Sequence, residues 1–314
     1  MLFRTVVALL LGEKVDADIL STNWQEIVKI AEKNGVHVPV AQKLSELPQP
    51  PVDLQNFCHK VKLEFASFWE TVGNIQDILA DNGIETSLIK TLKTYDYYDW
   101  DIDIVIHKQD WPGIVNLLAP GGWHIVRPSN WYRASIFLER KDKFQLKSAC
   151  PGIPVIHVQR GVVWLGVEYI PYDVLWPHTV SQTFLGREYR VPDPTIDLLI
   201  CSAHALFEMF ELSLGEVYHL ARALETKSVD MELATEIAQR NHWLKGLKLV
   251  TETVTNLSQS LSNIESLPYY YSLGQLWPVW LERAKSQLKR PKDIPKSIIE
   301  VGHVGFYMGK RVGL

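Results

Sequence analysis

The sequence predicts an α/β (α+β) protein in which a mixed sheet lies between helical segments at both ends of the chain. Apolar residues recur at helical spacing before residue 82 and after residue 192. Between these regions, short runs rich in β-branched residues alternate with turn residues. The chain has 314 residues, 46% of them hydrophobic, which is enough for two or three structural units. We expect an N-terminal helical segment over 1–82, an α/β core over 83–180 and a C-terminal helical domain over 181–314.

The N-terminal segment begins with an apolar run at 1–11, which predicts a core helix. Residues 23–47 predict two short helices separated at Asn34-Gly35, because glycine adopts the left-handed conformation that ends a helix. The prolines at 48–51 break this pattern, and a longer amphipathic helix follows over 52–82.

The middle of the chain predicts strands at 85–89, 102–106, 123–126, 135–138 and 155–158. A helix is expected over 110–118, followed by a turn at Gly121-Gly122. The order of strand, connection, strand, helix and further strands indicates a sheet covered by helices.

After Pro192-Asp193-Pro194, where Asp193 or Thr195 can cap a helix, helical periodicity returns and continues to Leu224. Further helices are expected over 230–241 and 244–261. The segment from 268 onward has no assignable pattern. Its basic stretch from Lys285 to Lys296 contacts RNA or a partner, or else forms an ordinary solvated face.

The overall charge and the cysteines exclude few functions. Net charge is −4 and the pI is about 6.2, so the bulk balance does not indicate nucleic-acid binding. Cys58, Cys150 and Cys201 are far apart, which argues against a disulfide framework or a structural zinc and favours a reducing, cytoplasmic location. No stretch approaches the roughly 18 apolar residues that span a bilayer, so no membrane partner is expected.

Asp101 and Asp103 open the strand-like run 101–106, and residues i and i+2 of a strand point to the same face. Two carboxylates held together raise each other's pKa unless a cation lies between them. A site of oxygen ligands favours Mg²⁺ or Mn²⁺, the ions of phosphoryl transfer. We therefore predict a metal site at Asp101 and Asp103, against the alternative of two solvated acids at a strand entrance.

The segment Leu88-Ile89-Lys90-Thr91, followed by Tyr95, Tyr98 and Asp101-Ile102-Asp103-Ile104-Val105-Ile106, resembles the core of the uncharacterised nucleotidyltransferase family of the polymerase-β type. The helical stretches at 24–36 and 196–224 are similar to its flanking helices. The resemblance covers about residues 20–225 and implies a nucleotidyltransferase-like mixed sheet. It also implies that a nucleoside monophosphate is transferred from a nucleoside triphosphate to an acceptor, which is a protein side chain, an RNA end or a small molecule.

Lys90, Thr91 and Lys93 follow the first strand, where phosphates would approach, and we expect them to bind the nucleotide. Lys93 is equally well explained as a surface lysine. The family has glycine at the position of Thr91, so the backbone approaches the phosphates less closely here, although the hydroxyl can replace one contact.

The third carboxylate of such sites aligns with His157, which is interpreted either as a ligand or base or as a structural histidine. Glu139 and Glu168 are the alternatives for this role. His204 and His219 lie on otherwise apolar helical faces with no second ligand expected at i+3 or i+4, so we interpret both as structural.

Four aromatic residues, Tyr95, Tyr97, Tyr98 and Trp100, precede the carboxylates and either wall a base-binding groove or belong to the core. A second function remains open, in which the fold is catalytically inactive and serves as a nucleotide-binding sensor, an antitoxin or a partner-binding module. His157 in the third acidic position is its main support.

Overall fold

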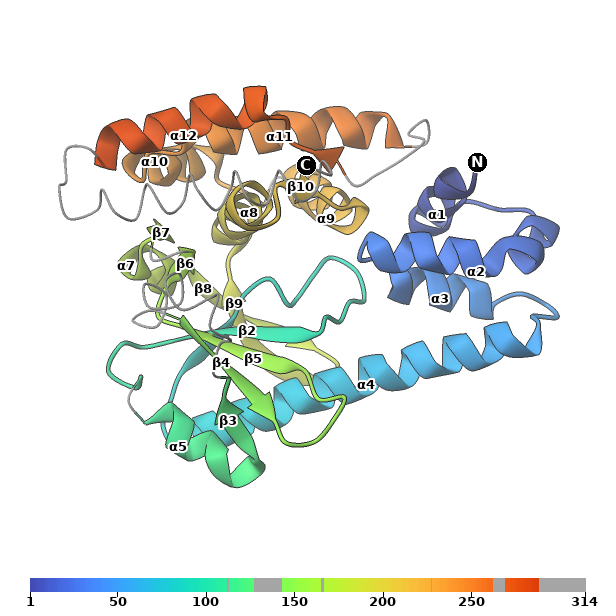
Figure 1. The fold of residues 1–314 in the computed structure, drawn as a ribbon, viewed down its shortest axis with the longest axis horizontal. Helices are drawn as coiled ribbons and strands as arrows, with labels where there is room; N and C mark the ends of the chain where they lie inside the picture. The colour runs from blue at the N-terminus through green and yellow to red at the C-terminus, as the bar shows by residue number, and fades with distance from the viewer. Residues whose placement is uncertain (112, 127–142, 165–166, 227, 262–268, 288–314) are drawn as a thin grey trace.

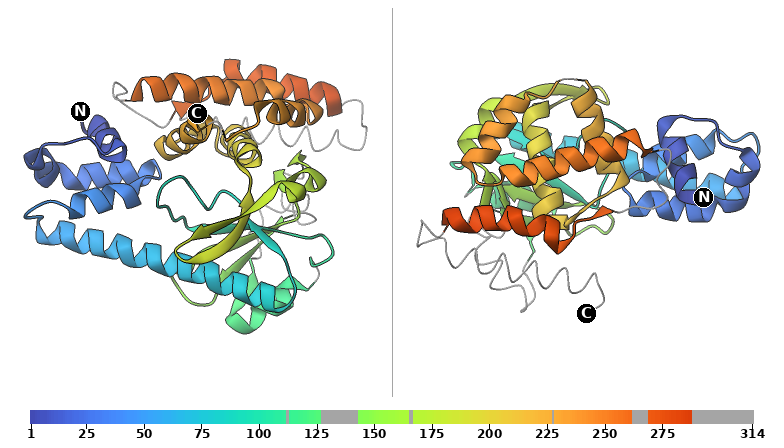
Figure 2. Two further views of the ribbon diagram at one scale, coloured as in Figure 1. Left: turned by 180° about the vertical axis from the view of Figure 1, so that it is seen from behind. Right: turned by 90° about the horizontal axis from the view of Figure 1, so that it is seen from above.

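A computed structural model confirms the mixed α+β class, with a central sheet and helices before and after it (Figure 1). It describes residues 1–111, 113–126, 143–164, 167–226, 228–261 and 269–287. In both views of Figure 2 the N-terminal helices stand to one side of the sheet and of the C-terminal helices. Among the described residues, no helix combines the length and the apolar character needed to cross a membrane.

The central sheet has the strand order β1-β2-β5-β4-β3, and β2 and β5 are its parallel pair. Its strands are β1 (Thr86–Leu88), β2 (Asp101–Ile106), β5 (Val155–Gln159), β4 (Lys143–Ser148) and β3 (Trp123–Ile125). The register of the parallel pair sets Asp103 opposite His157. The strands predicted at 85–89, 102–106, 123–126 and 155–158 are confirmed, whereas the one predicted at 135–138 lies outside the described residues.

Helix α4 (Val52–Asp81) packs its apolar face on this sheet (Figure 1). Phe68, Val72 and Leu79 belong to the same hydrophobic cluster as Ile102 and Ile104 of β2. Burial of such side chains contributes about 1.5–3 kcal/mol each. The carboxylates of β2 therefore stand on a rigid, fully packed strand.

The N-terminal helices are α1 (Leu2–Leu11), α2 (Ala17–Lys33) and α3 (His37–Ser45), and the periodicity predicts all three. Helix α2 is longer than predicted, because it begins at Ala17 rather than near residue 23. Gly35, between α2 and α3, has a positive φ of 67°, as expected for the glycine that ends a helix. Helix α5 (Ile114–Leu118) follows β2 along the chain, and it is shorter than the helix predicted over 110–118.

Two hairpins follow the sheet, β6 (Val162–Trp164) with β7 (Val167–Ile170), and β8 (Thr179–Phe184) with β9 (Arg187–Pro192). Their four strands were not predicted from the sequence. Tyr189 and Val191 of β9 belong to the hydrophobic cluster of the central sheet. The domain limits proposed at 82 and 180 stay a prediction.

The helix expected to continue from 193 to 224 is interrupted, which corrects that prediction. Helix α8 (Pro194–Ala203) passes into a π-helix, η4 (His204–Met209), and the chain then turns at Phe210, whose φ is +57°. A short strand β10 (Glu211–Leu212) precedes α9 (Leu214–Glu225). The remaining elements are α10 (Met231–Arg240), α11 (Leu244–Gln259), β11 (Tyr269–Tyr270) and α12 (Leu273–Gln287).

Three segments that are distant in sequence meet at the turn between α2 and α3, which we call the glycine junction (residues 34–35, Tyr95 and Gly215). The backbone N–H of Gly215 donates to the carbonyl of Asn34 at 3.0 Å, and the hydroxyl of Tyr95 donates to the carbonyl of Gly35 at 3.1 Å. The first turn of α9 and the connection between β1 and β2 are thus both fixed to the N-terminal helices.

Candidate functional site

Asp101 and Asp103 of β2 and His157 of β5 lie together at the parallel pair of the sheet. His157 Nδ1 is 3.1 Å from Asp101 Oδ2 and 3.4 Å from Asp103 Oδ1. One ligand atom from each of the three residues lies within 4.8 Å of the other two. The convergence predicted from the i, i+2 spacing and the alignment of His157 with these carboxylates is present in the structure.

This cluster fits a divalent cation. The side chain of His157 is only 5% exposed, and neither ring nitrogen makes an aligned hydrogen bond with a described residue. A buried polar atom without a hydrogen bond costs free energy unless another group satisfies it. Because Nδ1 faces both carboxylates, a cation between them would take up its lone pair. Asp101, Asp103 and His157 are the residues that would hold it.

Lys90 provides a positive charge beside Asp103. Its backbone is left-handed, with φ of +61°, a conformation that is costly for a residue with a Cβ. From this turn its Nζ reaches to 2.8 Å from Asp103 Oδ2 and 3.9 Å from Glu208 Oε2 of η4. Gln159 Nε2 donates to the other oxygen, Asp103 Oδ1, at 2.5 Å. Asp103 is therefore held from both sides.

These contacts give the two aspartates different proton affinities. Burial and the neighbouring Asp103 raise the pKa of Asp101 to about 8. Burial alone would also raise the pKa of Asp103, but Lys90 lowers it well below its usual range. Burial lowers the pKa of His157, so its ring is neutral and offers a lone pair. Asp101 keeps its proton at neutral pH unless a further positive charge enters the site.

The other two residues expected to bind nucleotide have internal partners. The hydroxyl of Thr91 is buried and donates to the carbonyl of Ile89 at 3.0 Å. Its only hydrogen-bond proton is therefore used within the turn. Lys93 directs its ammonium to the thiol of Cys201, 3.5 Å away, rather than joining the contacts of Asp101 and Asp103.

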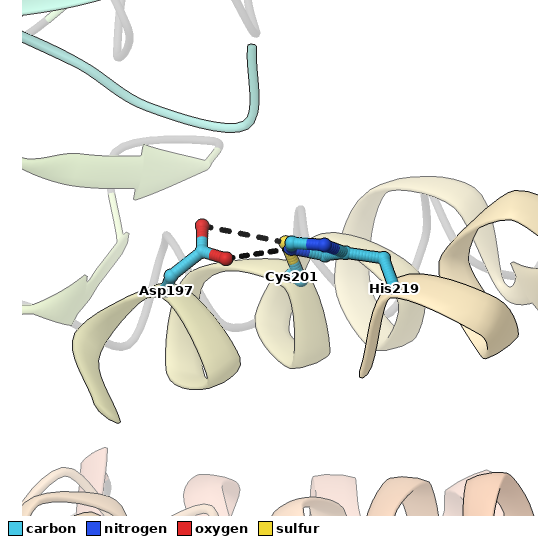
Figure 3. Close-up of side chains that lie close together, drawn as sticks. All are labelled: Asp197, Cys201 and His219. Carbon is cyan, nitrogen blue, oxygen red and sulfur yellow. Dashed lines mark hydrogen bonds and ion pairs between the residues drawn. The ribbon is translucent and has the colours of Figure 1, made fainter. Parts of the chain in front are cut away.

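Lys93 belongs to a second cluster, made of Asp197, Cys201 and His219, whose ligand-type atoms also lie within 4.8 Å of one another. Figure 3 shows Asp197 and Cys201 on successive turns of α8, facing His219 of α9. His219 Nε2 is 2.7 Å from Asp197 Oδ2, and Cys201 Sγ lies 3.8 Å from Asp197 Oδ1. His219 is thus not isolated, and its partners Asp197 and Cys201 were overlooked in the sequence analysis.

The hydrogen bonds of the second cluster favour a structural anchor over a metal site. The backbone N–H of Thr94 donates to His219 Nδ1 at 3.1 Å, so the proton of a neutral ring is on Nε2 and donates to Asp197. A metal at Nε2 would displace that proton and break this bond. Burial and Asp197 raise the pKa of Cys201 to about 12, so its thiol is neutral. The cluster fixes residues 93–94 to α8 and α9.

The aromatic residues before β2 divide into two groups. The hydroxyls of Tyr95, Tyr97 and Tyr98 donate to Gly35, Asp99 and Glu64, respectively, and their rings are partly buried. Trp100 is 65% exposed and its ring lies 5.6 Å from that of His157, in an edge-on arrangement. Trp100 is the aromatic side chain of the four that is open to solvent beside the carboxylates.

Of the two alternatives for the third carboxylate, Glu168 accepts a hydrogen bond from the backbone N–H of Tyr172 at 3.1 Å and caps the start of α7 (Tyr172–Leu175). Glu139 and the basic stretch beyond residue 287 lie outside the described residues. Gln159 and Glu208 were not predicted as site residues from the sequence. Glu208 follows His204 by four residues, so the helical pair i, i+4 was a readable signal, contrary to the expectation that His204 has no such partner.

Comparison with known families adds an independent finding. The chain matches the family described as uncharacterised nucleotidyltransferase over residues 21–258, a range that includes α4, the sheet and the helices α8 to α10. Searches of curated proteins and of solved structures find no match. Because the family match covers most of the chain, including both carboxylates of β2, the chain belongs to the uncharacterised nucleotidyltransferase family.

Proposed function

We propose that this protein is a metal-dependent nucleotidyltransferase that transfers a nucleoside monophosphate from a nucleoside triphosphate, such as ATP, to an acceptor. Membership of the family supports nucleotidyl transfer in general. The observation that carries the metal-dependent reaction is the convergence of Asp101, Asp103 and His157 Nδ1, which makes no aligned hydrogen bond with any residue that the structure describes. A cytoplasmic location, with Cys58, Cys150 and Cys201 as free thiols, is part of the same proposal.

Asp101, Asp103 and His157 would hold Mg²⁺ or Mn²⁺. When bound, such an ion offsets negative charge on the triphosphate and on the pyrophosphate leaving group. Lys90, which stands beside Asp103, adds a fixed positive charge for the phosphates. Thr91 and Lys93 contact phosphate only after leaving their bonds to Ile89 and Cys201.

The test uses the full chain with nucleoside triphosphates labelled at the α-phosphate, a divalent ion and cell extract. We expect a labelled product and released pyrophosphate, both dependent on Mg²⁺ or Mn²⁺. Omission of the ion and addition of a chelator are the controls. Absence of product with every triphosphate and ion would contradict the proposed reaction.

Replacing His157 with aspartate should change the preferred ion. An imidazole ligand suits Mn²⁺ better than Mg²⁺, whereas a set of three carboxylates suits Mg²⁺. We expect the native chain to bind Mn²⁺ more tightly than Mg²⁺ and His157→Asp to lose this preference. Mn²⁺ binding is measured by electron paramagnetic resonance with Mg²⁺ as competitor, and His157→Asn serves as a variant that lacks both ligand types. Equal preferences in the native chain and His157→Asp would contradict a role for His157 as ligand.

Trp100 is proposed to stack on the nucleotide base. Stacking of a base on an aromatic side chain contributes about 1–3 kcal/mol, so Trp100→Ala should weaken triphosphate binding by roughly 5- to 150-fold. Titration calorimetry with a non-hydrolysable triphosphate measures the change. Trp277→Ala is the matched control, because Trp277 on α12 is 59% exposed and is not part of the site. Equal affinities of Trp100→Ala and Trp277→Ala would contradict the stacking.

A second candidate function is a catalytically inactive member of the family that binds nucleotide as a sensor, antitoxin or partner-binding module. Two observations favour it, namely the histidine in the third acidic position and the ammonium of Lys90 against Asp103, whose side chain is only 4% exposed. Metal-dependent triphosphate binding without turnover for any acceptor would favour this candidate.

A further inference from the structure

The ammonium of Lys90 is shared between two carboxylates from different parts of the chain. Its Nζ is 2.8 Å from Asp103 Oδ2, on the central sheet, and 3.9 Å from Glu208 Oε2, on η4. Burial alone would lower the pKa of Lys90, but Asp103 and Glu208 raise it. The ammonium therefore keeps its charge whichever of the two carboxylates it contacts.

The contact between Lys90 and Asp103 opposes the binding of a divalent ion. His157 Nδ1 lies 3.4 Å from Asp103 Oδ1, so an ion held together with His157 would use this oxygen. Lys90 holds the other oxygen of the same carboxylate. Two positive charges on one carboxylate repel each other, and the repulsion is strong here because the Asp103 side chain is only 4% exposed. Ion binding therefore favours withdrawal of the Lys90 ammonium.

The carboxylate of Asp103 is less free to move than the ammonium of Lys90. Gln159 Nε2 donates to Asp103 Oδ1 at 2.5 Å. The backbone carbonyl of Asp103 accepts a bond from the N–H of Ile89 at 3.0 Å, and its strand, β2, lies between β1 and β5. A lysine, by contrast, carries its charge at the end of a flexible four-carbon chain. The ammonium is thus the group that moves when an ion reaches Asp103.

Glu208 is placed to receive this ammonium. An N–H···O bond is about 2.9 Å long, so an approach of about 1 Å would turn the 3.9 Å contact into a close ion pair. Glu208 lies on η4, a π-helix, and π-helical turns occur frequently at functional sites. Its Oε2 is held by His204 Nε2 at 3.4 Å. Burial alone would raise the pKa of Glu208, but Lys90 and Lys143 lower it to about 2, so its carboxylate is ionised at neutral pH.

We propose that Glu208 is a positioning residue for the metal-dependent transfer, and that it receives the ammonium of Lys90 when a divalent ion binds to Asp103. This inference rests on the proposed function. Lys90 leaves Asp103 Oδ2 and pairs with Glu208, and no proton is transferred. The full charge of Asp103 then faces the ion, while Lys90 stays beside the site for the phosphates. Glu208 thus determines the affinity for the ion without being one of its ligands.

A plain electrostatic role for Glu208 makes a different prediction. A negative charge on Glu208 attracts an ion through space, whatever Lys90 does. Glu208→Asp keeps this charge but shortens the side chain by one methylene, so its carboxylate no longer reaches the ammonium. If Glu208 acts through Lys90, Glu208→Asp should therefore behave like Glu208→Gln. If only the charge counts, Glu208→Asp should behave like the native chain.

The test measures the dissociation constant of Mn²⁺ on the full chain by electron paramagnetic resonance, without triphosphate. Glu208→Gln and Glu208→Asp should each weaken Mn²⁺ binding by about 10- to 100-fold, the range for residues that orient metal ligands. Lys90→Gln should tighten it by roughly 10-fold, because a like charge beside the ion is removed. In a chain that already carries Lys90→Gln, Glu208→Gln should have a much smaller effect, because no ammonium is left to receive.

Glu46→Gln is the matched control for the Glu208 variants. Glu46 also pairs with a lysine, since its Oε1 is 3.1 Å from Lys43 Nζ at the end of α3, and it has no contact with the candidate metal site. The substitution likewise removes one carboxylate from a lysine pair. The Mn²⁺ affinity of Glu46→Gln should equal that of the native chain.

The outcomes separate this inference from the proposed function. Equal Mn²⁺ affinities of the native chain and the Glu208 variants, each shown to be folded by thermal unfolding, overturn the role of Glu208 and leave the metal site intact. Native-like binding by Glu208→Asp, or an equal effect of Glu208→Gln with and without Lys90, also overturns it. If the Glu208 variants do not fold, Lys90→Gln decides, and unchanged or weaker Mn²⁺ binding overturns the inference. Absence of Mn²⁺ binding by the native chain contradicts the proposed metal site and this inference together.

Discussion

Asp101→Asn and Asp103→Asn are each expected to remove the metal-dependent transfer of label from a nucleoside triphosphate. The two carboxylates supply the negative charge that holds the ion, and an asparagine keeps the shape of the side chain but not the charge. Loss of one preorganised electrostatic group costs roughly 10²- to 10³-fold in rate, and loss of both should leave no measurable product. The measurement is the initial rate of pyrophosphate release with Mn²⁺ or Mg²⁺.

The control for these variants is Asp96→Asn. Asp96 lies in the same connection and accepts one hydrogen bond, from Gln42 Nε2 at 2.6 Å, which an asparagine oxygen can also accept. The activity of the Asp96→Asn variant and its midpoint of thermal unfolding should match those of the native chain. If Asp103→Asn kept full metal-dependent activity with a normal unfolding midpoint, the metal site at β2 would be wrong.

Gly215→Ala is expected to lower the free energy of unfolding by roughly 1–3 kcal/mol, the cost of overpacking a close contact. A Cβ at this position would lie 3.0 Å from the carbonyl oxygen of Asn34, 3.1 Å from that of Gly35 and against the hydroxyl of Tyr95. The two carbonyl oxygens are backbone atoms of the glycine junction, so they cannot move away as a flexible side chain could. Alanine is otherwise favoured over glycine within helices by up to about 1 kcal/mol, so a net loss identifies the junction as the cause.

Gly73→Ala is the matched control for the junction. The three atoms nearest to a Cβ at Gly73, within α4, all belong to the guanidinium of Arg187, which is the end of a flexible and half-exposed side chain. Arg187 can move, so this variant should be neutral or gain up to about 1 kcal/mol. Urea unfolding gives both values, provided that the slope with denaturant is unchanged. Equal effects of the two substitutions would show that the junction is not tightly packed.

Local periodicity predicted that Asp101 and Asp103 share one face of a strand, because strand residues alternate. His157 was predicted from the family resemblance, and its position opposite Asp103 depends on the pairing of β5 with β2, which periodicity does not give. The helices up to residue 81 and the helices α10 and α11 also follow from apolar spacing and from caps such as Asp230. Helix α12 was not predicted, because the segment from residue 268 onward had no assignable pattern.

The contacts of the lysines were not predictable, because they join segments far apart in sequence. Lys93 and Cys201 are 108 residues apart, and no local rule pairs them. The apolar periodicity continues through η4, so it gave no sign of the break before α9. Two local signals were nevertheless present, the capping-box spacing of Ser213 and Glu216, and the turn residues Leu185 and Gly186 between β8 and β9.

The glycine junction has a consequence for the order in which the molecule becomes complete during synthesis. The ribosome delivers the N-terminal helices and all strands of the sheet before it delivers Gly215, which holds the first turn of α9 against Asn34. His219, which anchors Thr94, emerges still later. A nascent chain that has not yet exposed His219 would carry both aspartates on a complete strand, but residues 93–94 would lack their anchor to α9. Such ribosome-bound intermediates are expected to be inert towards triphosphates.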